Sequence, residues 1–412
     1  MMLTVRCILF WLALLPTVAA AGDDADKAIG MIKQWGGKIV RDQAAKGNPV
    51  VGIDLSYCRI ADDMLKELAA FAELRELDLF GNKIGDEGIK HLRRLPRLQR
   101  VDLSLSRVTD DGLKELAGLK MLTTLGLTET AITGAGLDHL RGLVELKELQ
   151  LSGSAVTDDG MKSIASLQSL RVVILRDTKI TDQTMPFVGK LNKLEVLDLS
   201  GTKVGDAGAM SLASLIKLQT LRLDGTPISD AALKGFASLR ELQTLSFLHT
   251  RVTGVGLKNL SSLRVLNLQH TDLADKSVGE IAQLANLRDL SLAGCKVGDA
   301  GIIHLATLKS LRSLDVRGTR LSDEGLKAIV GLGELRTLNL GYTDISDRGF
   351  MELRSLAKLE ELRLSSTKIS DSALKSVREL KSLREIDLND TKVTDVGVKQ
   401  LRDALPKLTV NR

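Results

Sequence analysis

The chain has 412 residues, and its 57 lysine and arginine residues exceed its 52 acidic residues by only five. So small a net charge over this length argues against nucleic acid as a partner. Aromatic residues make up 3% of the sequence and apolar residues 44% in total, so the core has to be built from leucine, isoleucine, valine and alanine.

Residues 1–21 have the pattern of a secretory signal peptide. A short segment ending at Arg6 precedes an apolar stretch, small residues and an acidic start to the next segment. The stretch from Cys7 to Ala21 contains Pro16 and falls short of the roughly 20 residues that a bilayer span needs. We therefore expect cleavage and export to the periplasm, the cell envelope or the exterior, with no stable membrane span in the mature chain. A retained anchor is the alternative.

Residues 22–49 precede the repeats described next. Ile29, Ile32 and Trp35 recur at helical spacing, and a Gly-Gly pair separates them from a short strand-like segment, KIV. Repeat arrays need a terminal unit that covers the first open turn. We interpret residues 22–49 as this N-terminal cap, in which Trp35 forms part of the cover; a ligand contact at Trp35 is the alternative.

A 24-residue pattern runs from Val50 to the end of the chain. Three of its fifteen copies are LEVLDLSGTKVGDAGAMSLASLIK (194–217), LRSLDVRGTRLSDEGLKAIVGLGE (311–334) and LEELRLSSTKISDSALKSVRELKS (359–382). The first part alternates apolar and polar residues, which is typical of a strand with one buried face. The second part repeats apolar residues every third position behind an aspartate, which is typical of a helix. The period predicts stacked units, so residues 50–412 are expected to form one repeat domain.

This spacing resembles the leucine-rich repeat family. The second half of the repeat, T-x-[IV]-[TS]-D-x-[GA]-L, resembles the ribonuclease-inhibitor-like and cysteine-containing subclasses found in bacterial exported proteins. The resemblance implies an α/β fold, a right-handed horseshoe solenoid with a parallel β-sheet on the concave face and helices on the convex face. It further implies that a protein partner is held on the concave sheet or at its rim.

Position 9 of the repeat explains both cysteines of the mature chain. Each repeat has a small residue able to hydrogen-bond there, which is Cys58 in the first repeat and Cys295 in the eleventh. Such a column can satisfy backbone groups where the chain leaves the strand. We expect no disulfide between these distant cysteines; a reactive thiol or a metal ligand is the alternative.

Position 13 is aspartate in thirteen repeats, and Gly134 and Gly254 replace it in the other two. We expect each aspartate to cap the helix that it begins. The repeat that contains Gly254 is also three residues short, from Leu242 to Leu263. We expect a local bend or twist there, with a tolerated deletion as the alternative.

Positions 3, 5, 7 and 8 are left free by the framework and are expected on the concave face or its rim. Val172 and Ile174 are apolar at two of these positions in one repeat, and Val196, Leu248 and Val265 extend the strip. Contiguous exposed apolar surface marks binding sites, although branched residues also simply suit strands. With its polar neighbours, the candidate binding patch comprises Val172, Ile174, Arg176, Val196, Arg222, Asp224, Leu248, His249, Val265 and His270.

His249 and His270 occupy position 8 of adjacent repeats, where glycine is common. Stacking of the repeats would bring them together, with Arg222 and Asp224 one repeat away. A metal site needs three or four convergent ligands, so we expect none here. A pH-sensitive contact with a partner remains one hypothesis, and a solvated rim is the other.

A row of arginines occupies position 2 of four successive repeats. At repeat spacing the row would suit an acidic protein or an envelope polymer. The first repeats have the opposite bias, with aspartate at position 5, so the sequence predicts an acidic-to-basic gradient along the concave side; solvated surface is the alternative. The basic row comprises Arg264, Arg288, Arg312 and Arg336, with Arg317 nearby, and the acidic residues are Asp54, Asp78 and Asp102.

These observations favour a non-enzymatic, exported and monomeric scaffold that binds a protein without a cofactor. The sequence contains no P-loop, no H-E-x-x-H and no G-x-S-x-G motif. A structural or adhesion protein of the cell envelope is the alternative, and an enzyme accessory or regulatory subunit is a weaker one.

Overall fold

The computed structural model describes residues 23–412, and the expected signal peptide at residues 1–21 lies outside them. The described residues form two compact units, one ending at Leu149 and one from Gln150 to Arg412. Strand β6 (Glu148–Gln150) contains the division between them. The two units are described in turn.

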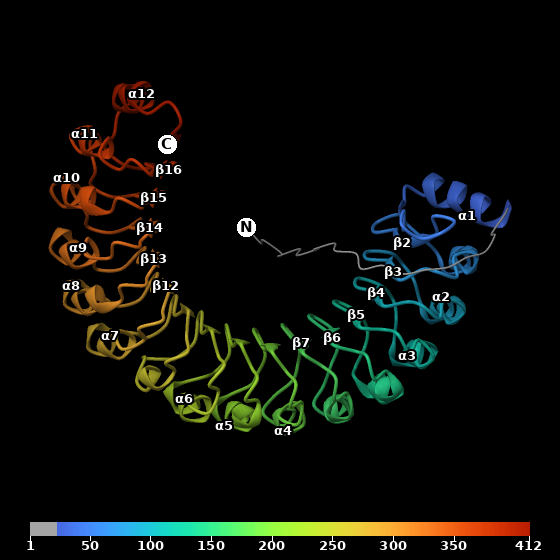
Figure 1. Ribbon diagram of the computed structural model, residues 1–412. Helices are drawn as coiled ribbons and strands as arrows, with labels where there is room; N and C mark the ends of the chain where they lie inside the picture. Colours follow the sequence, from blue (N-terminus) through green and yellow to red (C-terminus); the bar gives the residue numbers. More distant parts are fainter. Residues whose placement is uncertain (1–22) are drawn as a thin grey trace. The chain divides into compact units, whose positions relative to one another are not determined.

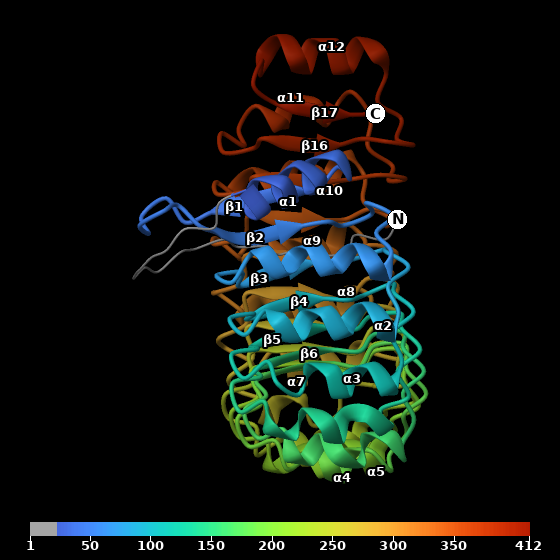
Figure 2. The same ribbon diagram turned by 90° about the vertical axis from the view of Figure 1, so that its right-hand side faces the viewer.

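The first unit begins with helix α1 (Asp23–Gln34) and strand β1 (Lys38–Arg41). Strand β1 pairs antiparallel with β2, whereas the later strands of this unit pair in parallel. Figures 1 and 2 show α1 at the end of the unit, beside β1 and β2. Ile29 and Ile32 of α1 are buried, as expected for a helix with one apolar stripe. The remaining strands are β2 (Val50–Asp54), β3 (Glu76–Asp78), β4 (Arg100–Asp102) and β5 (Thr124–Gly126).

The second unit repeats one strand per 24 residues, except in the repeat from Leu242 to Leu263, which is three residues shorter. Neighbouring strands pair in parallel with a constant register, so that Val172 faces Val196 and Leu314 faces Leu338. In Figure 1 the strands of this unit lie along the inner side of a curve and the helices along its outer side. The strands are β7 (Val172–Ile174), β8 (Val196–Asp198), β9 (Thr220–Arg222), β10 (Thr244–Ser246), β11 (Val265–Asn267), β12 (Asp289–Ser291), β13 (Ser313–Asp315), β14 (Thr337–Asn339), β15 (Glu361–Arg363), β16 (Glu385–Asp387) and β17 (Thr409–Asn411).

The expected helices are short, and several are 3-10 rather than α-helical. A segment of one or two turns is close to the length at which 3-10 bonding is common. The further α-helices are α2 (Asp86–Ile89), α3 (Asp110–Leu116), α4 (Met185–Val188), α5 (Asp206–Met210), α6 (Leu233–Phe236), α7 (Asp275–Ile281), α8 (Asp299–Ile302), α9 (Asp323–Ile329), α10 (Asp347–Phe350), α11 (Leu374–Val377) and α12 (Asp395–Ala404). The 3-10 helices are η1 (Asp62–Ala70), η2 (Lys90–Arg94), η3 (Ala135–Gly142), η4 (Gly160–Ser166), η5 (Ser211–Ser214), η6 (Asp230–Ala232), η7 (Leu257–Asn259), η8 (Ile303–Thr307) and η9 (Met351–Ser355).

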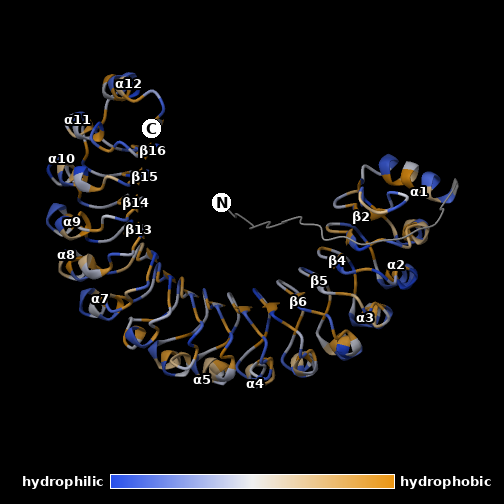
Figure 3. Cartoon of the chain, in the orientation of Figure 1, coloured by the Kyte–Doolittle hydropathy of each residue, from blue (hydrophilic) through white to orange (hydrophobic). Residues whose placement is uncertain are grey.

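The core of each unit lies between its strands and its helices. In one repeat Leu194, Leu197 and Leu199 from the strand side and Leu212 from the helix side are all fully buried. Hydrophobic residues recur in the same way along every turn (Figure 3). The apolar positions of the repeat therefore build the core, and the positions between them stay at the surface.

The column at position 9 is hydrogen-bonded, as the sequence predicted. The hydroxyl of Thr202 donates to the carbonyl of Leu199 at 2.6 Å, and the thiol of Cys295 donates to the carbonyl of Leu268 at 2.9 Å. Both Cys295 and Cys58 are free thiols. Burial raises the pKa of each thiol, which disfavours the reactive thiolate form.

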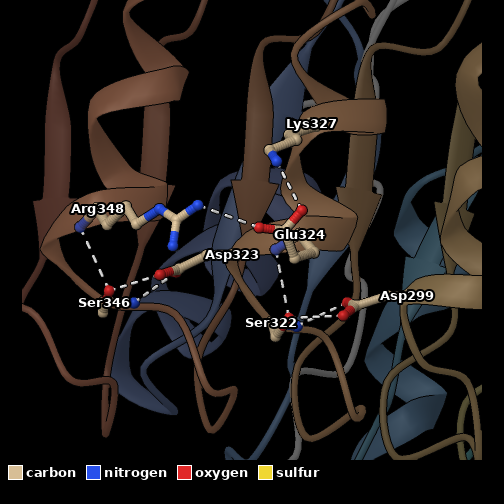
Figure 4. Close-up of polar contacts among 7 residues, drawn as sticks. All are labelled: Asp299, Ser322, Asp323, Glu324, Lys327, Ser346 and Arg348. Atoms are coloured by element: carbon tan, nitrogen blue, oxygen red, sulfur yellow. Dashed lines mark hydrogen bonds and ion pairs between the residues drawn. The ribbon is translucent and has the colours of Figure 1, made fainter.

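The role predicted for the aspartates at position 13 was wrong. In most repeats the aspartate is the first helical residue and the N-cap is the preceding residue: the N–H of Glu324 donates to the Ser322 hydroxyl at 3.3 Å. Asp158, Asp182 and Asp371 instead lie in the turn before the helix. The aspartate carboxylate instead reaches the next repeat. Asp323 accepts the N–H of Ser346 at 2.8 Å and its hydroxyl at 2.6 Å, and Asp299 holds Ser322 in the same way (Figure 4).

We call this recurring contact the aspartate column. The carboxylate binds the residue at position 12 of the following repeat, a serine or threonine such as Ser346 or a glycine such as Gly205. It therefore connects repeats rather than capping its own helix. The glycine at position 15 of that following repeat makes room for it. A Cβ atom at Gly112 would lie 2.4 Å from Oδ1 of Asp86.

The short repeat keeps its strand register. Thr244 of β10 still faces Val265 of β11, so the three missing residues are absorbed on the helix side, where η7 has only three residues. Gly254 and Gly256 both adopt positive φ, 97° and 98°, which a residue with a side chain rarely adopts. The N–H of Gly256 donates to Glu280 at 3.3 Å.

Candidate functional site

The strand face of the second unit is the surface of β7–β17 that points away from the helices. Along its position-3 column, Val172 faces Val196, Val196 faces Thr220, and Thr244 faces Val265. The apolar residues of β7 and β8 are therefore separated from Val265 by two threonines. The structure does not form the continuous apolar strip that the sequence suggested.

The apolar residues of β7 and β8 are grouped at one place on this face. Val172, Ile174 and Val196 are each half-buried, and the first and third face each other across the two strands. At position 5, however, Ile174 faces Asp198. The group is thus bordered by a carboxylate rather than by a further apolar residue.

Leu248 and Arg176 follow their strands instead of lying on them. Leu248 is half-buried in the turn after β10, and its N–H donates to Asp224 at 2.9 Å. Arg176 is exposed in the turn after β7 and pairs with Asp177 at 3.1 Å. Both residues border the carboxyl ends of the strands, away from Val265, which starts β11.

A polar cluster occupies the strand face of β8–β10. Oδ1 of Asp198 accepts the N–H of Ser200 at 2.9 Å and its hydroxyl at 2.6 Å. Nη1 of Arg222 lies 3.9 Å from Oδ2 of the same aspartate. Asp224 accepts the hydroxyl of Ser246. The cluster combines two carboxylates with one exposed guanidinium.

The two aspartates of this cluster differ in exposure and in charge environment. Asp198 is only 5% exposed. Burial raises the pKa of Asp224, and the charge of Asp198 adds to this; together they outweigh the hydrogen bonds from Ser246 and Leu248 and the charge of Arg222. The charged form of Asp224 is therefore less favourable than that of a free aspartate.

His249 and His270 stack face to face, as their place in adjacent repeats suggested. Their ring centroids are 4.6 Å apart and the rings are 6° from parallel. Both residues have positive φ, 56° and 53°, a conformation that costs a non-glycine residue about 1–2 kcal/mol. The ring of His270 covers Gly294, where a Cβ atom would lie 2.3 Å from Nδ1. The flanking glycine therefore makes room for the histidine pair.

The four arginines at position 2 stack directly on one another. The N–H of Arg288 donates to the carbonyl of Arg264 at 2.8 Å, Arg312 to Arg288 at 2.7 Å, and Arg336 to Arg312 at 2.7 Å. All four side chains are exposed. Arg317 lies apart from them, because β13 runs between Arg312 and Arg317.

The acidic residues at position 5 lie in the first unit. Asp54, Asp78 and Asp102 face one another in register on β2, β3 and β4. Each accepts the N–H of the residue two positions later at 2.9 Å. These aspartates therefore also stabilise the turn after their strand, a structural role that the sequence reasoning did not assign.

Sequence reasoning missed Asp198, Ser246, Thr220 and Thr244 as parts of the strand face. The signal was present, because these residues occupy the same repeat positions as Ile174, Arg222 and Val172. Reading each column in full, and not only its apolar members, would have found them. Within residues 23–412 no three histidine, cysteine, aspartate or glutamate side chains are grouped to hold a metal ion, and no helix there has the length and apolar character to cross a membrane.

The sequence matches the family model described as a leucine-rich repeat region over residues 54–252, 137–290 and 251–410. No curated protein matched it significantly.

Solved structures resemble the chain in fold. An internalin from Listeria monocytogenes is 22% identical, with a TM-score of 0.56 and 94% of each chain covered. A leucine-rich repeat protein from Leptospira interrogans is 23% identical, with a TM-score of 0.63, 87% of this chain and 95% of that chain covered. The ectodomain of an Arabidopsis thaliana membrane receptor kinase, in complex with CASPARIAN STRIP INTEGRITY FACTOR 2, is 18% identical, with a TM-score of 0.55, 90% of this chain and 51% of that chain covered.

Proposed function

Because the chain belongs to the leucine-rich repeat family, we propose that it is a non-enzymatic, exported scaffold that recognises a protein on the strand face of its second unit. The observation that carries the proposal is the contrast between framework and surface. Position 4 of the repeat is part of the core and is leucine in Leu197 and Leu221. Position 5, the next residue, lies on the strand face and changes from Ile174 to Asp198 to Arg222 in successive repeats. A constant frame that presents varied side chains on a broad surface suits macromolecular recognition.

We centre the contact on β7–β10, where apolar and charged groups adjoin. The group formed by Val172, Ile174 and Val196 offers apolar area, and the neighbouring Asp198 and Asp224 offer carboxylates. Buried apolar contacts surrounded by polar ones are the usual composition of a protein interface. The plant receptor ectodomain among the structural neighbours was solved with a bound factor, which supports the class of activity and not the identity of the partner.

The remaining parts of the proposal concern processing and organisation. We propose that residues 1–21 act as a signal peptide, that residues 22–49 cap the array, and that the mature chain is a monomer that acts outside the cytoplasm. Pairing of β1 with β2 supports the cap, because it covers the backbone edge of the first repeat strand. The helices opposite the strands support the ribonuclease-inhibitor-like subclass. No enzymatic step or cofactor is part of the proposal.

Affinity capture with residues 22–412 tests the proposed surface. The test variant is Ile174→Asp/Val196→Asp, and the control is Met210→Asp/Ile216→Asp, which makes the same chemical change at residues 54% and 59% exposed in and after α5 and η5. We expect the test variant to lose a partner that the native chain and the control both retain, with melting temperatures unchanged. Equal capture by all three proteins would refute the placement of the contact.

A further inference from the structure

The arginines of the basic row differ in how they are neutralised. Where arginine occupies position 2 in other repeats it commonly has a carboxylate partner: Arg171 pairs with Glu195 at 2.5 Å, and Arg336 pairs with Glu360 at 2.5 Å. In residues 23–412 the side chains of Arg264, Arg288 and Arg312 form neither a hydrogen bond nor an ion pair. Three consecutive guanidinium groups thus lack the kind of partner that Arg171 and Arg336 have.

Two carboxylates, Asp289 and Glu334, interact with the row through their charge, and Glu334 forms its ion pair with Lys358 instead. Asp289 follows Arg288 directly, and burial raises its pKa by more than the charges of Arg288 and Arg312 lower it. Like charges on neighbouring strands disfavour each other. The native chain therefore holds a row of positive charge whose neutralisation from outside would be favourable.

The spacing of the three arginines matches the spacing of carboxylates on a helix better than their spacing on an extended segment. The backbone hydrogen bonds from Arg288 to Arg264 and from Arg312 to Arg288 show that the three residues stack as neighbouring strands do, at intervals of about 4.8 Å, so the row spans about 10 Å. Carboxylates at i, i+4 and i+7 of an α-helix span about 10.5 Å along its axis. Three alternate residues of an extended segment span about 14 Å.

We propose that Arg264, Arg288 and Arg312 bind the acidic face of a helical segment in the protein partner. The inference rests on the proposed function in taking the ligand to be a protein, and it names a second contact beyond the apolar group on β7 and β8. Each guanidinium can bind a carboxylate through two parallel N–H bonds, and the helix presents one carboxylate per turn to one arginine. Arg336, already paired with Glu360, marks the end of the binding row.

The test uses helical peptides as probes. One alanine- and glutamine-rich peptide of about 20 residues has glutamate at i, i+4 and i+7, a second has the same composition with the glutamates spread around the helix, and a third is an extended peptide with glutamate at every second residue. Circular dichroism checks that the first two are equally helical. Fluorescence anisotropy measures binding to the mature native chain, to Arg288→Gln/Arg312→Gln, and to the control Arg354→Gln/Arg378→Gln.

The control removes the same charge from exposed arginines of η9 and of the residue that follows α11. We expect the one-face helix to bind the native chain and the control equally, and the test variant about tenfold more weakly, with an affinity that falls as salt rises. Equal binding to all three proteins would overturn the proposal, as would equal binding of the two helices or tighter binding of the extended peptide.

A polymer ligand is tested in the same assay. If heparin binds through the row and none of the peptides does, the ligand of the row is a sulfated polysaccharide rather than a helical segment, and the proposal is overturned. The capture experiment with Ile174 and Val196 variants reports on a different part of the strand face. Failure of the peptide-binding assay therefore does not affect the capture result, and failure of the capture experiment does not affect the peptide result, so the two proposals can be refuted separately.

Discussion

Replacing Gly112 by alanine should destabilise α3 only while Asp86 is present. Asp86 accepts the N–H of Thr109 at 2.9 Å and its hydroxyl at 2.6 Å, and an alanine Cβ at position 112 would lie 2.4 Å from Oδ1 of Asp86. Such a contact is far too short, so the carboxylate must move away from Thr109. Gly112 lies inside α3, where alanine is otherwise the better residue.

The magnitude follows from these two opposing effects. A hydrogen bond to a charged group contributes about 1.5–3 kcal/mol, so displacing the carboxylate costs about 2 kcal/mol. Alanine in place of glycine returns about 1 kcal/mol of helix propensity. Gly112→Ala alone should therefore destabilise the helix by about 1 kcal/mol. In an Asp86→Ala background the same substitution should be neutral or stabilising, because the nearest atom to the new Cβ is then Val108 Cγ1, at 3.2 Å.

Native-state hydrogen exchange of the α3 amides measures this cycle directly. Opening free energies from the native chain, the two single variants and the double variant give the coupling, which we expect to be about 2 kcal/mol. A local measurement is preferable because long repeat arrays need not unfold as one cooperative unit. Effects that add within about 0.5 kcal/mol would refute the reasoning, since independent sites behave that way.

Thr226→Val should destabilise the chain by about 1 kcal/mol in urea denaturation, whereas Thr226→Ser keeps the donor and should not; equal midpoints would argue against the position-9 column. Cys58 and Cys295 should both react slowly with iodoacetamide at neutral pH, Cys295 the more slowly because it is 3% exposed, and fast equal labelling of the folded chain would contradict this. Burial raises the pKa of Asp158, but hydrogen bonds from Thr184 and Thr181 outweigh it and hold that pKa below the usual 3.8. The stabilisation by Asp158 is thus present above that pH and lost as the pH falls through the folded pKa; amide protection at α4 should fall there, and Asp158→Asn should remove the transition.

The repeat framework could be predicted because it depends on short-range periodicity. Leucine at fixed positions identifies the buried side of strand and helix, and a column such as Cys295 behind Thr271 needs only the assumption that successive repeats stack. That assumption was correct: the thiol of Cys295 reaches the carbonyl of Leu268, a repeat away in the sequence.

The aspartate column could not be predicted by local reasoning. An aspartate before a helix is read as an N-cap, but Asp323 finds its partner in Ser346, 23 residues later. Two signals in the repeat pointed to the true role. Serine or threonine often precedes the aspartate and can cap the helix itself, and glycine at position 15, as at Gly349, leaves room for a carboxylate.

The candidate site was predicted in its parts but not in its arrangement. The stacking of His249 on His270 and the row from Arg264 to Arg336 follow directly from their repeat positions. The predicted apolar strip is not continuous, because Thr220 and Thr244 lie between Val196 and Val265 in the strand register. Reading the position-3 column in full, on the assumption that successive repeats stack, would have shown this interruption.

The most direct test of the account is hydrogen exchange of the mature chain with and without its captured protein partner. If the partner is recognised on the strand face, protection should increase in the strands and following turns from β7 to β14, while α4–α10 exchange as before. Protection confined to those helices, with the strands unchanged, would contradict the proposed function.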